Sequence, residues 1–331
     1  MSFTEFTKRR RQDYLDEQSY QNTLDRLHLE RVELRDRLSI EGLTPRGYTG
    51  TKGMLAWREW YIFELKFTAG EKLSVLADSL IDIVNAFEEY KRALDQDPES
   101  NGDSPFQIDN DTIDDYVSYL NLLSSCILLG RAELVERVAM LLNGTDLFGE
   151  DEVIDELLKF FLPSYKVTDE WFWEKPYTLL LEAIESTDRD TAAKVMKSYV
   201  KKWYSSMKGQ ASFWGKHEKT KPEYTIYRGY WDMSAAAFTY LYRLDDTSYR
   251  NEIIYPREMV DFARSLPHRE NADQAMLSQL RVIAGNPCTR SGFWFTAARQ
   301  DSRSKFQEGD IMPTIAHSNY GLTIWQWDAQ Q

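Results

Sequence analysis

Histidines, the usual general acids and bases near neutral pH, are few and isolated in this 331-residue chain. No phosphate-binding loop, nucleophile elbow or paired-histidine zinc motif accompanies them. His317 has the best sequence neighbours for hydrolytic chemistry, namely Arg299, Arg303, Lys305 and Asp310. We favour a loop histidine without a catalytic role, because none of the four forms a recognisable catalytic arrangement: His28, His217, His268 and His317. The sequence therefore predicts no enzymatic activity and no cofactor.

Carboxylates are far more abundant, and most of the excess acidity lies in one quarter of the sequence. The net charge is -13, and the segment from Asp78 to Glu156 has 20 acidic and 4 basic residues, against 33 and 36 elsewhere. A field of this sign repels nucleic acid and favours encounter with a basic protein. We predict two groups of partner-binding carboxylates. The first is Asp95, Asp97, Glu99, Asp103, Asp109, Asp111, Asp114 and Asp115, and the second is Glu150, Asp151, Glu152, Asp155 and Glu156.

The spacing of these carboxylates does not suit a calcium-binding loop. Such a loop needs glycine at its sixth position, and a loop starting at Asp95 or at Asp109 has none there. We therefore predict no metal site. The segment Asp95–Asp111 lacks periodicity and contains two prolines, which predicts a linker.

The elements before this linker are predicted to be helical. Thr4–Ser39 is typical of one long helix with a narrow apolar stripe, which suits packing against a helical body or a second copy of the chain as a homodimer. Arg31 falls on the stripe and argues against a long regular coiled coil. Glycines in Ile40–Gly53 predict a mobile loop, and Met54–Leu94 is predicted to be helical with a break at Gly70. The apolar stripe of Thr4–Ser39 consists of Tyr20, Leu24, Leu27, Leu34 and Leu38.

After the linker, short apolar helices alternate with brief turns, which is typical of antiparallel helical hairpins. One hairpin pairs Thr112–Leu129 with Ala132–Leu142, and another pairs Pro176–Glu185 with Arg189–Tyr204. The predicted fold is all-α, an array of such hairpins with a long N-terminal helix. The spacing is too irregular to indicate a true repeat.

The composition changes again at Gly285, where the chain becomes aromatic and irregular. We expect this C-terminal tail to form a small amount of β structure and to pack on the helical body, because its aromatic side chains are costly to leave in water. The predicted domains are a helical region at 1–94, an acidic linker at 95–111, a helical-hairpin domain at 112–285 and the tail at 286–331.

The most distinctive segment is a further hairpin between Tyr227 and Arg264. Helical spacing from Trp231 through three alanines to Tyr242 predicts a first helix, and the alanines allow a neighbouring helix to approach closely. Four polar residues follow as turn or capping groups, and a second helix is predicted to begin near a proline. The four polar residues are Asp245, Asp246, Thr247 and Ser248, and the proline is Pro256.

In order and spacing, this hairpin resembles the C-terminal domain of the PoNi proteins, the polymorphic-nuclease immunity family. The resemblance implies a largely helical, non-enzymatic protein that neutralises an antibacterial toxin, in many members a nuclease delivered by type VI secretion. Ser234 departs from the family pattern, in which we expect a glutamate before the alanines. The matching positions are Gly229, Tyr230, Trp231, Ala235, Ala236, Ala237, Asp245, Asp246, Thr247, Ser248, Tyr255 and Pro256.

Cysteine usage and hydropathy predict the compartment. Cys126 and Cys288 are distant in sequence and have no partners at metal-ligand spacing, which favours a reducing environment. The N-terminus has a basic cluster without a following apolar stretch, and no apolar run reaches the length of a membrane span. A cytoplasmic protein that binds no membrane is therefore predicted.

Together these features favour an immunity protein that binds its cognate toxin stoichiometrically and occludes the active site. The acidic groups would contact the basic surface that a nuclease needs for phosphate, and aromatic residues would supply desolvated contacts. Two alternatives stay open at this point: a hydrolase that reverses the toxin's modification through His317 and tail carboxylates, and a helical adaptor that dimerises through the N-terminal helix.

Overall fold

The structure, a computed structural model, describes most of the chain. The described residues are 5–100, 103–108, 111–145, 148–162, 165–186, 188–266, 281–296, 299, 302–315 and 323–327.

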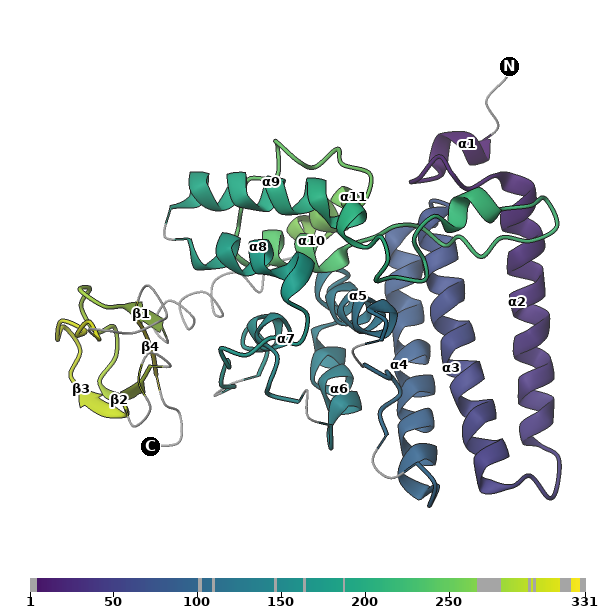
Figure 1. The fold of residues 1–331 in the computed structure, drawn as a ribbon, viewed down its shortest axis with the longest axis horizontal. Helices are drawn as coiled ribbons and strands as arrows, with labels where there is room; N and C mark the ends of the chain where they lie inside the picture. Colours follow the sequence, from purple (N-terminus) through teal and green to yellow (C-terminus); the bar gives the residue numbers. More distant parts are fainter. Residues whose placement is uncertain are drawn as a thin grey trace. The chain divides into compact units, whose positions relative to one another are not determined.

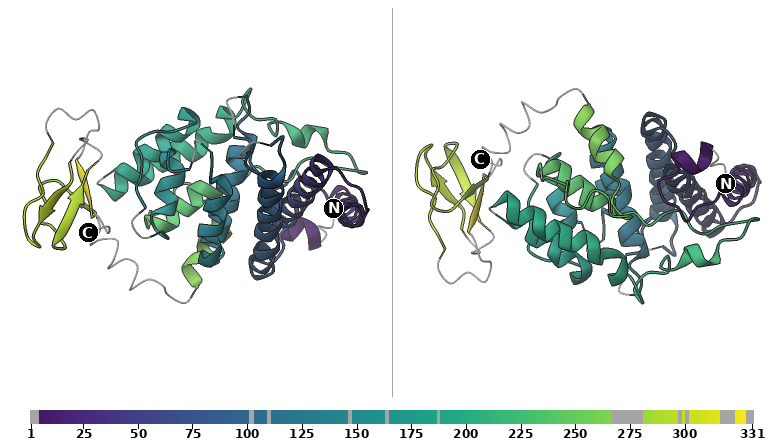
Figure 2. Two further views of the ribbon diagram at one scale, coloured as in Figure 1. Left: turned by 90° about the horizontal axis from the view of Figure 1, so that it is seen from below. Right: turned by 90° about the horizontal axis from the view of Figure 1, so that it is seen from above.

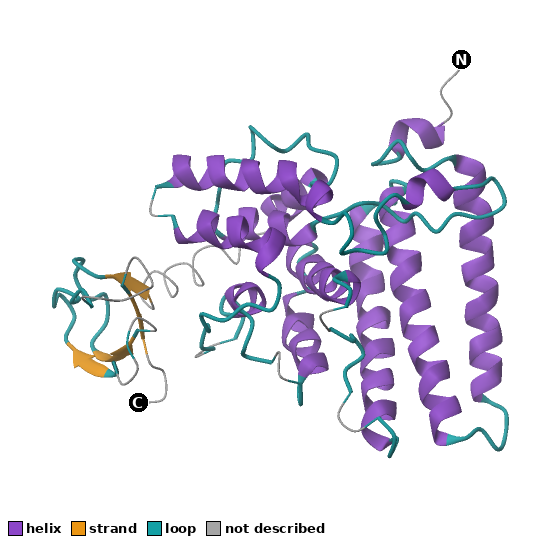
Figure 3. Ribbon diagram, in the orientation of Figure 1, coloured by secondary structure: helices purple, strands orange, loops and turns teal. Residues whose placement is uncertain are grey.

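The chain divides into two compact units. Unit 1 comprises residues 1–148 and 173–265, and unit 2 comprises residues 149–172 and 266–331. The predicted boundaries after residues 94, 111 and 285 do not coincide with these units. The prediction of a mainly helical chain with some β structure near the C-terminus is confirmed (Figure 3). The longer helices of unit 1 are α2 (Glu17–Leu38), α3 (Pro45–Thr68), α4 (Leu73–Gln96), α5 (Asp114–Leu128), α8 (Glu174–Glu185) and α9 (Arg189–Ser206).

The N-terminal part of unit 1 contains α2, α3 and α4 side by side (Figure 1). The predicted single helix from Thr4 to Ser39 is wrong, because the chain breaks between α1 (Glu5–Arg9) and α2. The Asp16 carboxylate caps α2 by accepting from the backbone N–H of Ser19 at 2.9 Å. Such a cap satisfies an amide that has no partner within the helix.

The apolar stripe of α2 packs against α3 of the same chain. Its members Tyr20, Leu24 and Leu27 are buried. Arg31 reaches Glu59 of α3 at 2.8 Å, which explains a charged residue on an otherwise apolar stripe. A homodimer through this stripe stays a prediction, and it would require α2 to exchange α3 for a second copy.

The predicted loop from Ile40 to Gly53 is mostly helix, because α3 begins at Pro45. Thr44 caps this helix, and proline suits its first turn because the missing N–H would have no partner there. A Cβ on Gly53 would lie 2.8 Å from the ring of Tyr90 on α4. The glycine therefore permits close packing of two helices, and its presence was misinterpreted as a loop signal.

The helical segment from Met54 to Leu94 with a break at Gly70 is confirmed by α3 and α4. Gly70 adopts a φ of +85° between the two helices. This left-handed conformation favours glycine and ends α3.

The acidic segment that follows α4 is anchored in the core of unit 1. Phe106 is buried, and its ring lies 4.8 Å from that of Phe87, 5.3 Å from that of Tyr119 and 5.4 Å from that of Trp57. These contacts join the segment to α3, α4 and α5. Asp103 therefore lies three residues from a buried anchor.

The predicted helical hairpins are confirmed, and Figure 2 shows their helices from two further sides. Helix α5 is followed by short helical turns, and α8 pairs with α9. The short elements are η1 (Ala132–Leu134), α6 (Val135–Ala139), η2 (Met140–Leu142), η3 (Lys216–Lys219), α10 (Met233–Leu241) and α11 (Arg257–Ser265).

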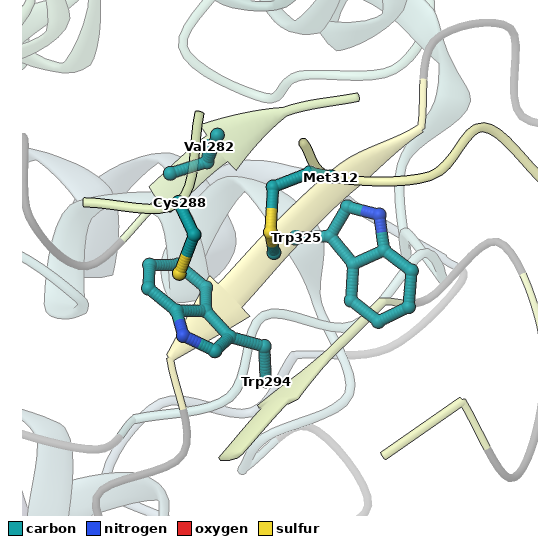
Figure 4. Packing of buried hydrophobic residues seen from close by; sticks show 5 residues of the cluster. All are labelled: Val282, Cys288, Trp294, Met312 and Trp325. Carbon is teal, nitrogen blue, oxygen red and sulfur yellow. The ribbon is translucent and has the colours of Figure 1, made fainter. Parts of the chain in front are cut away.

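Unit 2 combines the short helix α7 (Glu152–Leu158) with a four-stranded antiparallel sheet in the order β1-β4-β2-β3. The strands are β1 (Arg281–Ile283), β2 (Gly292–Phe295), β3 (Ser304–Phe306) and β4 (Ile324–Trp327). The sheet has its own small core (Figure 4), formed by Val282, Cys288, Trp294, Met312 and Trp325.

Both cysteines are free and buried, as small hydrophobic residues often are. Burial raises the pKa of the Cys126 thiol to about 12, which keeps it protonated.

Of the helices that the structure describes, none has the length and apolar character needed to cross a bilayer.

Candidate functional site

Gly229 packs so closely that no side chain fits at this position. Its φ is +111°, and a Cβ would overlap the indole nitrogen of Trp231 and the hydroxyl oxygen of Thr68. Trp231 donates from Nε1 to that hydroxyl at 2.8 Å, and the hydroxyl in turn donates to the Arg228 carbonyl. The segment before α10 is therefore held on the C-terminal end of α3.

Gln12, in the break between α1 and α2, binds the same segment from the other side. This buried side chain donates to the Tyr230 carbonyl at 2.8 Å and to the Ile253 carbonyl at 2.7 Å. Its oxygen accepts from the Tyr230 backbone N–H at 2.8 Å and from the Tyr227 hydroxyl. A buried amide with these partners explains why the N-terminal helix is interrupted here.

Helix α10 begins at Met233, so Trp231 precedes the helix on which the sequence predicted it to lie. Asn121 of α5 bridges this start, donating to the Trp231 carbonyl at 3.0 Å and accepting from the Met233 N–H at 2.9 Å. The alanine triplet is fully buried, and α10 packs on α5. Ser234 is buried too, and it donates to the Asp232 carboxylate that caps α10.

The turn after α10 contains two adjacent aspartates that make different contacts. Asp245 is exposed and accepts from the backbone N–H of Thr247 at 3.0 Å, which confirms the predicted turn. Asp246 is buried and receives Arg264 at 3.1 Å, Arg250 at 3.3 Å and the Tyr255 hydroxyl at 3.3 Å. The second aspartate therefore connects the turn to α11.

A cleft of about 220 Å³ opens beside the glycine and tryptophan of this segment. Helix α3 contributes Trp57, Tyr61 and Glu64 to its lining, and the start of α5 contributes Asp114 and Asp115. The cleft thus brings two of the predicted acidic residues next to the motif Gly229–Trp231. The lining of the cleft also includes Trp203, Ser212, Lys216 and Arg228.

The carboxylates of the cleft are engaged by protein donors. Asp114 accepts from the Ser212 backbone N–H at 2.8 Å and from its hydroxyl at 2.6 Å. Asp115 accepts from the backbone N–H of Gln107 at 2.8 Å. Glu64 forms an ion pair with Arg228 at 2.8 Å. These acids therefore fix the walls of the cleft.

The basic groups of the cleft have fewer partners. The guanidinium carbon of Arg228 lies 3.7 Å from the centroid of the Tyr61 ring, in a cation–π contact. Burial lowers the pKa of Lys216, and the nearby positive charge of Arg228 lowers it further. Trp203 is buried, and its indole N–H finds no acceptor in the described part of the chain.

The predicted acidic residues divide by exposure. Asp109 lies outside the described residues. The exposed ones are Asp95, Glu99, Asp103, Asp111 and Glu150; the partly exposed ones are Asp114, Asp115 and Glu152; the buried ones are Asp97, Asp151, Asp155 and Glu156.

The buried members of the second group have a local structural role in unit 2. Asp151 caps α7 by accepting from the Ile154 N–H at 3.0 Å, and it also accepts from the Phe172 N–H at 2.9 Å. Asp155 accepts from the Tyr165 hydroxyl at 3.0 Å and from the Thr168 N–H at 3.1 Å. Glu156 pairs with Lys159. The acidic character of this stretch therefore reflects the folding of residues 149–172 as well as surface charge.

Asp155 makes the stability of the protein depend on pH. Burial raises the pKa of its carboxyl to about 7 from 3.8, despite the two hydrogen bonds that favour the charged form. Because the folded state holds this proton more tightly, the contribution to stability is present at low pH and is lost as pH rises from about 4 to about 7. Replacing Asp155 by Asn should flatten the pH dependence of the free energy of unfolding in this interval. Denaturant unfolding at several pH values measures it, and an unchanged slope would contradict the assignment.

The hydrolase alternative receives no support from the described residues. His317 lies outside them, and His217 bonds through Nδ1 to the Tyr230 hydroxyl at 2.7 Å. Within the described ranges there is no group of three histidine, cysteine, aspartate or glutamate side chains that could hold a metal ion.

Sequence reasoning missed Trp57, Tyr61, Glu64, Lys216 and Arg228 as parts of one cleft. Of these residues, only Arg228 could have been found from the sequence, because it directly precedes Gly229 of the matched hairpin. The others come from separate segments, and their proximity depends on the packing of α3 and α5.

Comparison with known proteins supports the resemblance seen in the hairpin. Residues 149–259 match the family described as PoNe immunity proteins (PoNi), C-terminal. A search of curated proteins found no match. The fold is similar to that in the crystal structure of protein PA2201 from Pseudomonas aeruginosa, with a TM-score of 0.61 and 20% identity over 77% of this chain and 90% of that one. At this identity the likeness concerns the fold alone.

Proposed function

The chain is PoNi-like over residues 149–259, and from this premise we propose that it is an immunity protein that neutralises a cognate antibacterial toxin. The toxin is a nuclease, in a type VI secretion setting, and the protein meets it in the cytoplasm. Neutralisation is stoichiometric and involves no catalytic step, no membrane and no nucleic acid. The family match is the observation that carries this proposal.

The charge of the chain supports binding by occlusion. A nuclease active site is basic where it holds the phosphates of its substrate, so an acidic inhibitor is attracted to it. The net charge here is -13, and exposed carboxylates such as Asp103 and Asp111 flank the buried anchor Phe106. Because Phe106 anchors the stretch 103–108, Asp103 loses little conformational freedom when a partner binds.

The proposal is tested by producing the protein together with the toxin encoded by the neighbouring reading frame. Cells that produce the toxin should survive only when they also produce this protein, and the two proteins should copurify as one complex. A neighbour that is not toxic, or whose toxicity this protein does not relieve, would refute the immunity function.

Reversing two exposed charges should slow association with the toxin. We expect Asp103→Lys with Asp111→Lys to lower the association rate by about threefold to tenfold at low salt, because long-range attraction is weakened. The difference from the wild type should shrink as ionic strength approaches about 0.15 M, where the Debye length is about 8 Å. Stopped-flow mixing of the purified proteins measures both effects.

A matched control separates local charge from net charge. Glu33 and Asp36 are exposed on α2, outside the acidic segment, and replacing both by lysine changes the net charge equally. This control should bind at nearly the wild-type rate. Equal slowing by both double variants would show that only the total charge matters and that the acidic segment is not the contact surface.

A further inference from the structure

We propose that the cleft of unit 1 receives a carboxylate side chain of the bound toxin, held by Lys216 and Arg228. This inference rests on the proposed function and deepens it, because it assigns part of the toxin interface and the chemistry of the group bound there.

Two cationic side chains of the cleft have donor groups without acceptors within the described structure. Lys216 makes no side-chain hydrogen bond or ion pair there. Arg228 uses only Nε for Glu64, which leaves both terminal nitrogens of its guanidinium available.

The carboxylates of the cleft are not free to bind a cationic ligand. Asp114, Asp115 and Glu64 already accept hydrogen bonds from Ser212, Gln107 and Arg228 respectively. A cationic ligand would have to compete with these donors. An anion would instead accept from Lys216 and from the terminal nitrogens of Arg228, so the unmet hydrogen-bonding capacity of these two side chains is for an acceptor.

The electrostatics of Lys216 agree with this assignment. Its pKa is lowered first by burial and then by the positive charge of Arg228, and the negative charges of Asp114 and Glu64 offset this only in part. A carboxylate placed between the two cations would favour the charged lysine and raise its pKa again. Ligand binding would thus relieve the repulsion between Lys216 and Arg228.

A protein-borne carboxylate fits better than a free small anion. The net charge of -13 repels isolated anions, whereas a basic protein is attracted and carries its own acidic side chains into contact. Nuclease active sites that use metal ions hold them through carboxylates. A cleft that captures such a carboxylate would withdraw it from the metal, which links the geometry directly to neutralisation.

The test compares two lysines of the same short helix, η3. Lys216 lines the cleft, whereas Lys219 is exposed and is not part of the lining. Affinity for a catalytically inactive form of the neighbouring toxin is measured by calorimetry for the wild type, Lys216→Met and Lys219→Met. We expect Lys216→Met to raise the Kd by about tenfold to a hundredfold, the effect of losing a charge-assisted hydrogen bond. Lys219→Met should bind like the wild type, and all three should have the same melting temperature.

Each outcome separates this inference from the proposed function. Toxin binding by the wild type with equal Kd values for both variants would overturn the carboxylate assignment and leave the immunity function intact. Failure of the wild type to bind the toxin would overturn both. A second arm titrates the wild type with sodium acetate and follows the indole ¹⁵N–H resonances; saturation by acetate together with an unchanged toxin affinity of Lys216→Met would identify a small-molecule site and overturn the toxin as the source.

Discussion

The Gly229→Ala variant is expected to lose about 3–5 kcal/mol of its free energy of unfolding. The added methyl group would overlap the Trp231 indole nitrogen and the Thr68 hydroxyl, and both are fixed by the hydrogen bond between them. Relief would require the indole to leave its donor position, which breaks the connection between α3 and the start of α10. Chemical denaturation followed by circular dichroism measures the loss.

Gly209→Ala is the matched control for the backbone. Gly209 also has a positive φ, +83°, but a Cβ there would meet no atom within 4 Å. Its replacement should cost about 1 kcal/mol, the strain of a left-handed conformation alone. Equal losses for the two alanine variants would show that Gly229 is required for its φ alone and that the close packing has no energetic role.

The Asp246→Ala variant should be destabilised by about 1–3 kcal/mol. Removal of this buried carboxylate leaves Arg264 and the Tyr255 hydroxyl without their acceptor, and it weakens the placement of Arg250. The buried Tyr255 hydroxyl contributes most of this cost, because the Arg264 and Arg250 side chains are partly exposed and can be hydrated. Thermal unfolding should therefore begin at a clearly lower temperature than in the wild type.

The neighbouring Asp245→Ala variant provides the control. Asp245 is exposed and bonds only within its own turn, to Thr247. Its loss should change the melting temperature little. Similar melting temperatures for both variants would mean that the turn is held mainly by apolar packing, with little contribution from the ion pairs of Asp246.

The helical hairpins were predictable because their apolar spacing and turn residues act locally. The apolar runs around α8 and α9 and the residues of the turn at Asp245 give the same structural signal in sequence and structure. The glycines of α3 were misinterpreted because their role, illustrated by Gly53 against Tyr90, depends on a partner helix that is distant in sequence. The break before Asp16 was missed for the same reason, since the buried partners of Gln12 belong to residues 227–253.

The candidate site was predictable only in part. Acidic composition gives the abundance of carboxylates, but it cannot distinguish exposed ones such as Asp103 from Asp151 and Asp155, which accept hydrogen bonds from backbone amides. The cleft was not predictable, because Trp203 and Lys216 acquire their position only when α9 and the segment after it fold beside α3 and α5. Residue type gives the chemistry of a site, whereas tertiary packing decides which groups lack partners.

The most direct test of the central claim is a titration of toxin activity. Purified toxin from the neighbouring reading frame, at a concentration far above the Kd, is mixed with increasing amounts of this protein, and the remaining nuclease activity is measured on plasmid DNA. Stoichiometric occlusion predicts a linear fall to zero at about one equivalent, independent of the incubation time after mixing. Complete inactivation by a small fraction of an equivalent, progressing with time, would show turnover and contradict the account.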